Sequence, residues 1–363
     1  MPKVISNTSY FQGNDLKKNL DIAIDGALIS NIKESNDKEN SESFVVPGFI
    51  DLQIYGAGDR LFSADPSIES LTIMEDDLLK KGTTGFLACM ATNSPEVFNE
   101  CIKVAKEHRS SAKNCLGLHL EGPFLNPQRL GAHVPAFVRK ALLDEIKKLI
   151  DFGDGVIKMM TIAPELQDDE VIEYLLDNGV VVSLGHSNAT FEEATKAYNN
   201  GIQTTTHLFN AMSPIHHREP GIPTAVFSHH KAMASIIVDG QHLDFEVVKF
   251  AHKLLKERLF LITDAVTACS TGPYQHIQKG NKYVMPDGTL SGSSLTMLEA
   301  VKNCVSYCNI SLNDAVKMAT IYPAKLIGIE NLTANIATGE QANLVVLDDE
   351  LNLKEVIFKG ETV

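Results

Sequence analysis

Residues that could bind a metal or transfer a proton stand directly after short apolar runs of this 363-residue chain. Glu121 follows one such run, His186 and His207 follow two later ones, and Asp264 follows the last. One carboxylate and two imidazoles make a three-ligand set that leaves positions open for water, which is typical of catalytic zinc sites. Asp264 could then exchange a proton with that water and a leaving amine, or it could orient a ligand histidine.

The first apolar run, VPGFIDLQIYG at residues 46–56, ends in polar side chains of a different kind. Many metal-dependent hydrolases carry two histidines at such a strand end, whereas this chain has Gln53 and Tyr55 there. We therefore predict one metal, with Gln53 bonded to a ligand or to the bound water and Tyr55 filling the second position. The alternative is a two-metal cyclic-amide hydrolase that would use Lys158 as a bridging lysine, although a Lys158 facing the outer layer or solvent is favoured.

Several loop residues could contact a substrate. Asn210, Ala211 and Arg218 share one loop, where the guanidinium and the backbone N–H groups could bind an anion such as phosphate. An ordinary solvated loop is the alternative. His133, in a glycine-containing turn, could hydrogen-bond a carbonyl and stabilise an oxyanion. The segment DGTLSGSSLTM, residues 287–297, could be a substrate loop or a helix entry.

The positions of these residues predict the fold. From Pro47 onward, apolar strand-like runs alternate with amphipathic helix-like runs, which favours a (β/α)8 barrel of the α/β class. Active sites of such barrels lie at the carboxyl ends of the strands, so the residues that follow the runs, including His242, should converge. The predicted strands are residues 49–53, 85–91, 115–120, 156–162, 180–184, 203–206, 234–238 and 259–263.

The composition restricts the class of partner. The formal net charge of −14 argues against nucleic acid and anionic membranes, both of which need a cationic face. The six cysteines form no C-x-x-C pair, which favours reduced thiols. No apolar run is long enough to span a bilayer and the first residues lack a signal-like apolar segment, so a cytoplasmic protein is expected.

Several sequence blocks together resemble a known family over nearly the whole chain. The blocks are PGFIDLQIYG, GLHLEGPFLNPQRLGAH, VSLGHSNAT, THLFNAMSP, LITDAV and GTLSGSSLTM. They are similar to those of the N-acetylglucosamine-6-phosphate deacetylases of the amidohydrolase superfamily. The resemblance implies a barrel over residues 47–335 and a small β-sandwich built from residues 1–46 and 336–363, both of which read as β-rich.

The resemblance also implies roles for individual residues. Glu121, His186 and His207 match the family's metal ligands, Asp264 matches its general base and then acid, and His133 matches the residue that polarises the acetyl carbonyl. The implied ion is one divalent metal per chain, zinc first, with Fe²⁺, Mn²⁺ or Co²⁺ as alternatives. The positions that match substrate-binding residues are Asn210, Ala211, Arg218, His242, Leu290, Ser291 and Gly292.

The implied reaction is hydrolysis of N-acetyl-D-glucosamine 6-phosphate to D-glucosamine 6-phosphate and acetate, in amino-sugar catabolism or cell-wall recycling. A homodimer in which Arg218 reaches across the interface is the implied assembly. The galactosamine epimer of the substrate is an alternative. A sugar-phosphate sensor without catalysis would lack a metal ligand or Asp264, and all of these residues are present.

Overall fold

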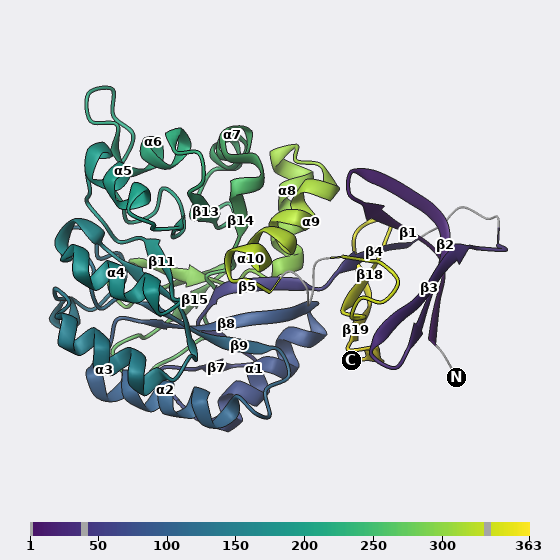
Figure 1. Ribbon diagram of the computed structural model, residues 1–363, viewed down its shortest axis with the longest axis horizontal. Coiled ribbons are helices and arrows are strands. Elements are labelled where there is room, and N and C mark those ends of the chain that lie inside the picture. Colours follow the sequence, from purple (N-terminus) through teal and green to yellow (C-terminus); the bar gives the residue numbers. More distant parts are fainter. Residues whose placement is uncertain (1–2, 38–42, 330–334) are drawn as a thin grey trace.

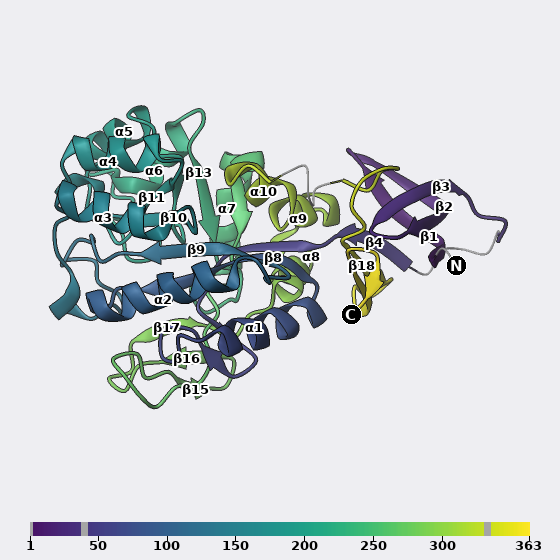
Figure 2. The same ribbon diagram turned by 60° about the horizontal axis from the view of Figure 1, so that its bottom comes forward.

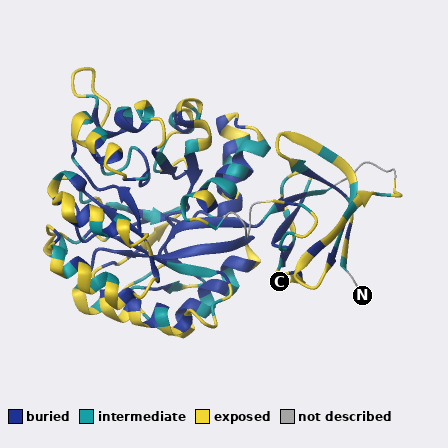
Figure 3. Cartoon of the chain, viewed as in Figure 1, coloured by how far each residue is buried: buried dark blue, intermediate teal, exposed yellow. Residues whose placement is uncertain are grey.

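The computed structural model describes residues 3–37, 43–329 and 335–363 and consists of a large α/β body with a smaller sheet beside it (Figure 1). The chain starts in the smaller sheet, runs through the large body and returns to the smaller sheet, so both ends lie on the same side (Figure 1). The apolar core lies mainly along the central strands of the large body, while the outer faces of its helices are exposed (Figure 3).

The large body is built on eight parallel strands that pair in the order in which they follow one another in the chain. A bridge between Ile54 and Ala265 connects the two ends of this sheet and nearly closes it. The predicted (β/α)8 barrel is confirmed, because each predicted run overlaps one strand. The strands are β5 (Phe49–Ile54), β8 (Thr83–Ala91), β9 (Cys115–Glu121), β10 (Ile157–Ile162), β11 (Val181–Leu184), β12 (Thr204–Thr205), β13 (Met233–Ile236) and β14 (Leu259–Leu261).

Helices cover the outside of the barrel and bury one face each. Strand β8, for example, is buried over its whole length, as expected for a parallel strand covered on both faces. None of the helices in the described ranges combines the length and apolarity of a membrane span. The helices are α1 (Ile68–Lys80), α2 (Pro95–His108), α3 (Leu143–Gly153), α4 (Asp169–Asp177), α5 (Phe191–Asn199), α6 (Gly221–Ser228), α7 (Phe245–Leu255), α8 (Met297–Cys308), α9 (Leu312–Met318) and α10 (Ile321–Leu326), with short 3-10 turns η1 (Pro135–Phe137), η2 (Pro164–Leu166) and η3 (Lys256–Arg258).

The smaller sheet joins strands from both ends of the chain. Its order is β20-β19-β18-β4-β1-β2-β3, so the C-terminal strands pair with β4 and through it with the N-terminal ones. Side chains from both groups, such as Ile22 and Leu344, form a core separate from that of the barrel. The strands are β1 (Lys3–Gln12), β2 (Asp15–Asp25), β3 (Leu28–Glu34), β4 (Ser43–Pro47), β18 (Leu344–Asp348), β19 (Leu353–Phe358) and β20 (Glu361–Thr362). Residues 1–2, 38–42 and 330–334 of the predicted domains lie outside the described residues.

A third sheet lies against the barrel in the segment between β14 and α8 (Figure 2). It consists of β15 (Ile277–Lys279), β16 (Lys282–Val284) and β17 (Leu290–Ser293), and a short hairpin of β6 (Gly56–Ala57) and β7 (Arg60–Leu61) lies nearby. A bridge between Ala265 and Ser293 connects β17 to the end of the barrel sheet. The predicted substrate loop at residues 287–297 therefore contains a strand beside the barrel mouth.

A buried carboxylate on α1 fixes the entry into β9. Glu75 Oε1 accepts hydrogen bonds from the backbone N–H groups of Lys113, Asn114 and Cys115 at 2.7, 3.1 and 3.0 Å. Its Oε2 lies 3.0 Å from Nε2 of the buried His108 on α2. One side chain thus satisfies three backbone donors immediately before the strand that ends at the candidate site.

Replacing this carboxylate should destabilise the barrel. In Glu75→Ala, three backbone donors and His108 lose their partner in a buried place, so the free energy of unfolding should fall by about 3 kcal/mol or more. Urea unfolding followed by circular dichroism measures the change. The neighbouring exposed Asp76→Ala removes only a surface ion pair with Lys113 and should change stability by less than about 1 kcal/mol. Equal stabilities of the two variants would contradict this role of Glu75.

Candidate active site

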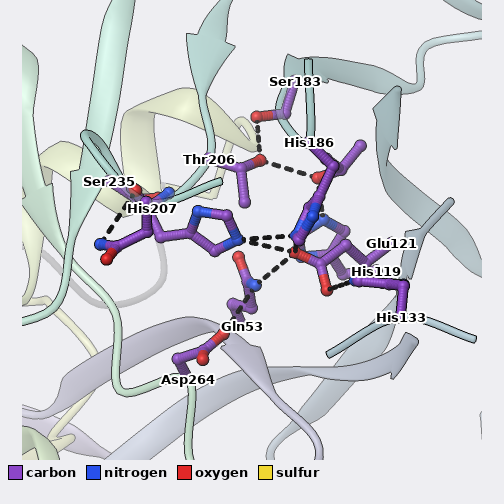
Figure 4. Close-up of polar contacts among 12 residues, drawn as sticks. Gln53, His119, Glu121, His133, Ser183, His186, Thr206, His207, Ser235 and Asp264 are labelled. Atoms are coloured by element: carbon purple, nitrogen blue, oxygen red, sulfur yellow. Dashed lines mark hydrogen bonds and ion pairs between the residues drawn. The ribbon is translucent and has the colours of Figure 1, made fainter. Parts of the chain in front are cut away.

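The residues singled out in the sequence converge at the carboxyl ends of the barrel strands (Figure 4). Glu121 is the last residue of β9, and His186 and His207 follow β11 and β12. Glu121 Oε1 lies 3.2 Å from Nε2 of His186 and 3.1 Å from Nε2 of His207, and the two nitrogens are 3.1 Å apart. All three side chains are buried. Three potential ligand atoms therefore surround one point inside the barrel mouth.

The hydrogen bonds and the burial of the two histidines allow a cation to bind at this point. Nδ1 of His186 lies 2.9 Å from the backbone carbonyl of Arg129, to which it donates, so the Nε2 atom of the neutral ring carries a lone pair. Burial lowers the pKa of His207 and favours its neutral form. Nδ1 of His207 is buried and has no hydrogen-bond partner among the described residues, so the ring can present either a proton or a lone pair at Nε2. With lone pairs on both Nε2 atoms, a positive charge between them and the Glu121 carboxylate would be stabilising. The set fits a divalent metal.

A third histidine, His133, also contacts Glu121 and gives an overlapping group of potential ligands. Glu121, His133 and His186 offer ligand atoms within 4.8 Å of one another. However, Nδ1 of His133 accepts the backbone N–H of Thr92 at 3.3 Å, so Nε2 of the neutral ring must hold the proton. That nitrogen lies 3.0 Å from Glu121 Oε2 and donates to it. Burial brings the pKa of His133 to about 4, which keeps the ring neutral. His133 is thus arranged as a hydrogen-bond donor.

Asp264 lies beside this group and is connected to it through Gln53. Gln53 Nε2 lies 2.8 Å from Asp264 Oδ1, 3.0 Å from Glu121 Oε1 and 2.9 Å from the Tyr55 hydroxyl. The Tyr55 hydroxyl donates to Glu121 Oε2. Burial, and then the negative charge of Glu121, raise the pKa of Asp264 well above its usual range. Gln53 and Tyr55 therefore occupy the space next to the first strand and bond to Glu121 itself.

The backbone is strained where the site is built. His186, His207, Ala211 and Asp264 have φ values of 46°, 29°, 49° and 54°, in the left-handed region that residues with a side chain rarely adopt. Such conformations cost of order 1–3 kcal/mol each and persist only where the surrounding structure imposes them. The strand ends are thus bent so that these side chains turn toward the axis of the barrel.

A cavity of ≈ 210 Å³ opens onto this group. Asn210, Ala211 and His242 belong to its lining, and Nδ1 of His242 lies 2.7 Å from Asp239 Oδ2. Arg218 is exposed and is absent from the lining among the described residues. The predicted residues that line the cavity are Tyr55, Glu121, His133, His186, His207, Asn210, Ala211, His242, Asp264, Leu290, Ser291 and Gly292.

Lys158 is exposed near the start of β10, which confirms the solvent-facing interpretation. A bridging lysine would have to point into the barrel mouth. The arrangement required by a two-metal cyclic-amide hydrolase is therefore absent at this position.

Sequence reasoning missed several polar residues that hold the site together. Buried His119 contacts the backbone carbonyl of Leu52 and Thr161 Oγ1, at 2.9 and 2.8 Å. It precedes Glu121 by two positions in a strand, so the alternation of strand side chains could have placed both on one face. Glu165 carries no such signal. It bonds to the loop after β9 and to the loop that follows His186.

Comparisons with known proteins identify the family to which this fold and sequence are similar. Residues 44–363 match the amidohydrolase family. A relative from Haemophilus influenzae, named N-acetylglucosamine-6-phosphate deacetylase, is 33% identical over 99% of both chains. A human relative of the same name is 34% identical over 88% of this chain and 83% of its own. The crystal structure of the Pasteurella multocida enzyme of that name superimposes with a TM-score of 0.94 at 32% identity and covers 100% of both chains.

More distant structures share only the fold. A Xaa-Pro dipeptidase with bound methionine superimposes with a TM-score of 0.64 at 16% identity, over 100% of both chains. The barrel with its added small sheet is thus common to enzymes whose named substrates differ, and only the side chains at the strand ends can distinguish their reactions.

Proposed function

This chain belongs to the amidohydrolase family, among the N-acetylglucosamine-6-phosphate deacetylases, and we propose that it hydrolyses N-acetyl-D-glucosamine 6-phosphate to D-glucosamine 6-phosphate and acetate. The observation that carries the proposal is the convergence of Glu121, His186 and His207 with Asp264 at one cavity. Release of acetate from this substrate by the purified protein, and its loss on chelation, test the activity.

One divalent cation per chain is expected at Glu121, His186 and His207, with zinc as the first choice and iron, manganese or cobalt as alternatives. When bound, such a cation lowers the pKa of a bound water and polarises the acetyl carbonyl. Gln53 and Tyr55 support a single ion, because an amide and a phenol stand where a second ion would need imidazoles.

The residues around the cation site have separate roles in the reaction. Asp264 takes the proton from the attacking water and then gives it to the amide nitrogen, which can leave only as a neutral amine. His133 holds its proton on Nε2, where it bonds to Glu121 Oε2 in this structure, and would turn this donor to the carbonyl oxygen of the substrate while negative charge develops there. Gln53 keeps Asp264 beside Glu121 and thereby beside the water.

The sugar phosphate would be held in the cavity by Asn210, the backbone N–H of Ala211 and His242, because the Asn210 N–H already donates to the His207 carbonyl at 2.9 Å. Positioning the phosphate also places the acetamide against Asp264. The hydroxyls of the sugar then face the remaining wall. The galactosamine epimer differs at one of these hydroxyls and is the second candidate substrate.

A homodimer would explain the place of Arg218. This side chain is exposed and lies outside the lining of its own cavity, just before α6. Large apolar side chains are exposed on the loop of Arg218, with Ile215 at 49%, and on α7, with Phe250 at 48% and Leu254 at 43%. The Phe250 ring packs edge-on against Phe227 of α6 at 5.8 Å. A second copy that covers this apolar face could receive Arg218 at its phosphate site.

Two broader assignments accompany this function. We propose that residues 1–46 and 336–363 form the small β domain and residues 47–335 the catalytic barrel, which the pairing of β4 with β18 supports. We also propose a cytoplasmic location, because the six cysteines are free thiols.

The choice of metal ligands can be tested by metal content. His207→Ala should lose most of the bound metal because it removes one of three ligands, whereas His133→Ala should retain it. Elemental analysis of dialysed protein measures both, and the wild type should contain one ion per chain. Retention in His207→Ala with loss in His133→Ala, or two ions that are both needed for activity, would refute the assignment.

The role of Asp264 can be separated from metal binding. Asp264→Asn should lower kcat by at least about 1000-fold, because the amide can neither accept nor return the proton, and metal content should stay unchanged. Asp244→Asn is the matched control, because Asn caps helix α7 as well as Asp does and the position lies outside the cavity. Substantial turnover by Asp264→Asn would exclude it as the acid–base residue.

The role of Arg218 predicts a change in KM. Arg218→Ala should raise KM for the phosphorylated substrate at least about tenfold with little change in kcat, because the charge-assisted bond to phosphate is lost. Activity on unphosphorylated N-acetylglucosamine should not change. Lys231→Ala removes another exposed cation and serves as control. If KM is unchanged, or if the protein is monomeric at concentrations where it is active, Arg218 has no such role.

A further inference from the structure

His276 lines the cavity but has no part in the roles described so far. It immediately precedes β15 and is 6% exposed. Its Nδ1 atom lies 2.9 Å from Oγ of Ser291, which also lines the cavity, on β17. The sequence reasoning did not single out this residue, because it lies in the connection after Asp264 rather than at a barrel strand end.

The ring of His276 is held in place from several sides. It stacks on Tyr274 with ring centroids 6.3 Å apart and meets the edge of Tyr283 at 6.5 Å. Its backbone carbonyl accepts the N–H of Cys269 at 3.1 Å, and the Tyr274 hydroxyl donates to the backbone carbonyl of Thr92. A buried imidazole fixed by two aromatic rings and one hydroxyl has little freedom to turn.

The second nitrogen of this ring is available to a ligand. Among the described residues nothing hydrogen-bonds His276 Nε2, and it is not one of the polar atoms sealed from solvent. Burial brings the pKa of His276 to about 4, so the ring is neutral near pH 7. A neutral imidazole offers one donor and one acceptor, which suits a hydroxyl better than a phosphate.

The position of His276 and Ser291 in the cavity indicates which part of a ligand they contact. Strand β17 runs beside Asp264, because the Ser293 N–H donates to the Asp264 carbonyl at 2.9 Å and a Cβ on Gly292 would lie 2.8 Å from that carbonyl. Asp264 and His133 serve the acetamide in the proposed function, and Asn210, Ala211 and His242 serve the phosphate. Because other residues serve the acetamide and the phosphate, the wall that contains His276 and Ser291 is expected to contact the sugar hydroxyls.

We propose that His276, oriented by Ser291, binds a ring hydroxyl of the amino-sugar phosphate through Nε2 and so determines which sugar epimers are accepted. The inference rests on the proposed function and extends it to the sugar. A site built to hydrogen-bond a hydroxyl rejects analogues that lack it, because its buried polar atom is then left without a partner.

Kinetics with deoxy substrates test this role. We compare wild type, His276→Leu and His276→Gln on N-acetylglucosamine 6-phosphate, on its 1-, 3- and 4-deoxy analogues and on the 4-epimer. His276→Leu should raise KM for the full substrate about three- to tenfold and change kcat less, because one neutral hydrogen bond is lost. His276→Gln, whose amide can reach a similar position, should restore part of the affinity. Tyr283→Phe keeps the packing against His276 and is the matched control.

The deoxy series distinguishes a direct contact from a structural effect. For one of the three analogues, the wild type should show a raised KM while His276→Leu shows no further loss relative to the full substrate. The inference is overturned if His276→Leu has an unchanged KM. It is also overturned if KM rises by the same factor on every analogue and Tyr283→Phe raises KM in the same way. Thermal unfolding of each variant confirms that it is folded, and His276→Gln provides the test if the leucine variant is not. No acetate release by metal-loaded wild type would refute the proposed function itself, which is a distinct result.

Discussion

The structure of the site depends on one buried carboxylate. Glu121 ends strand β9 and contacts His186, His207 and His133, as well as Gln53 and Tyr55. Burial would raise its pKa, but the surrounding imidazoles hold it well below the usual range, so the ionised form is the stable one. A negative charge sealed in the barrel mouth requires positive charge or donors around it. His133, Gln53 and Tyr55 supply such donors, and a cation held with His186 and His207 would supply the charge in the proposed function.

Proton positions separate histidines that look alike in the sequence. His186 gives its Nδ1 proton to a backbone carbonyl and presents a lone pair, whereas His133 accepts a backbone N–H and presents a proton. The same type of side chain can therefore offer a lone pair to a cation in one place and a hydrogen to an acceptor in the other. The backbone of neighbouring loops makes this assignment, because it decides which nitrogen of each neutral ring carries hydrogen.

The third sheet gives the barrel a wall that the strand ends cannot supply. Barrel strands bring Glu121, His186, His207 and Asp264 to one point, while β17 and the segment before β15 close the side beside Asp264. This division suits an enzyme that must hold a reacting amide rigidly and also recognise a sugar. A solved structure with the same fold carries a different named substrate, so the fold alone does not determine the substrate.

The sequence by itself determined the barrel, its order of strands and most of the candidate site. Apolar runs that end in Glu121, His186, His207 and Asp264 can be recognised because parallel strands share one edge and bring their last residues together. The presence of Gln53 and Tyr55 where histidines would be needed for a second ion likewise predicts a single metal. The strands and the residues that follow them can be predicted from the sequence, because each is defined by residues that are neighbours along the chain.

Only the tertiary structure decided how distant segments meet. The left-handed backbone at the strand ends, the tautomers of His133 and His186, and the support that Glu165 gives to two loops depend on contacts across the fold. His276 illustrates the limit most clearly, because its chemistry depends on Ser291, Tyr274 and the cavity they share. Periodicity and motif spacing describe neighbours along the chain, whereas burial and hydrogen-bond partners are fixed by packing between elements.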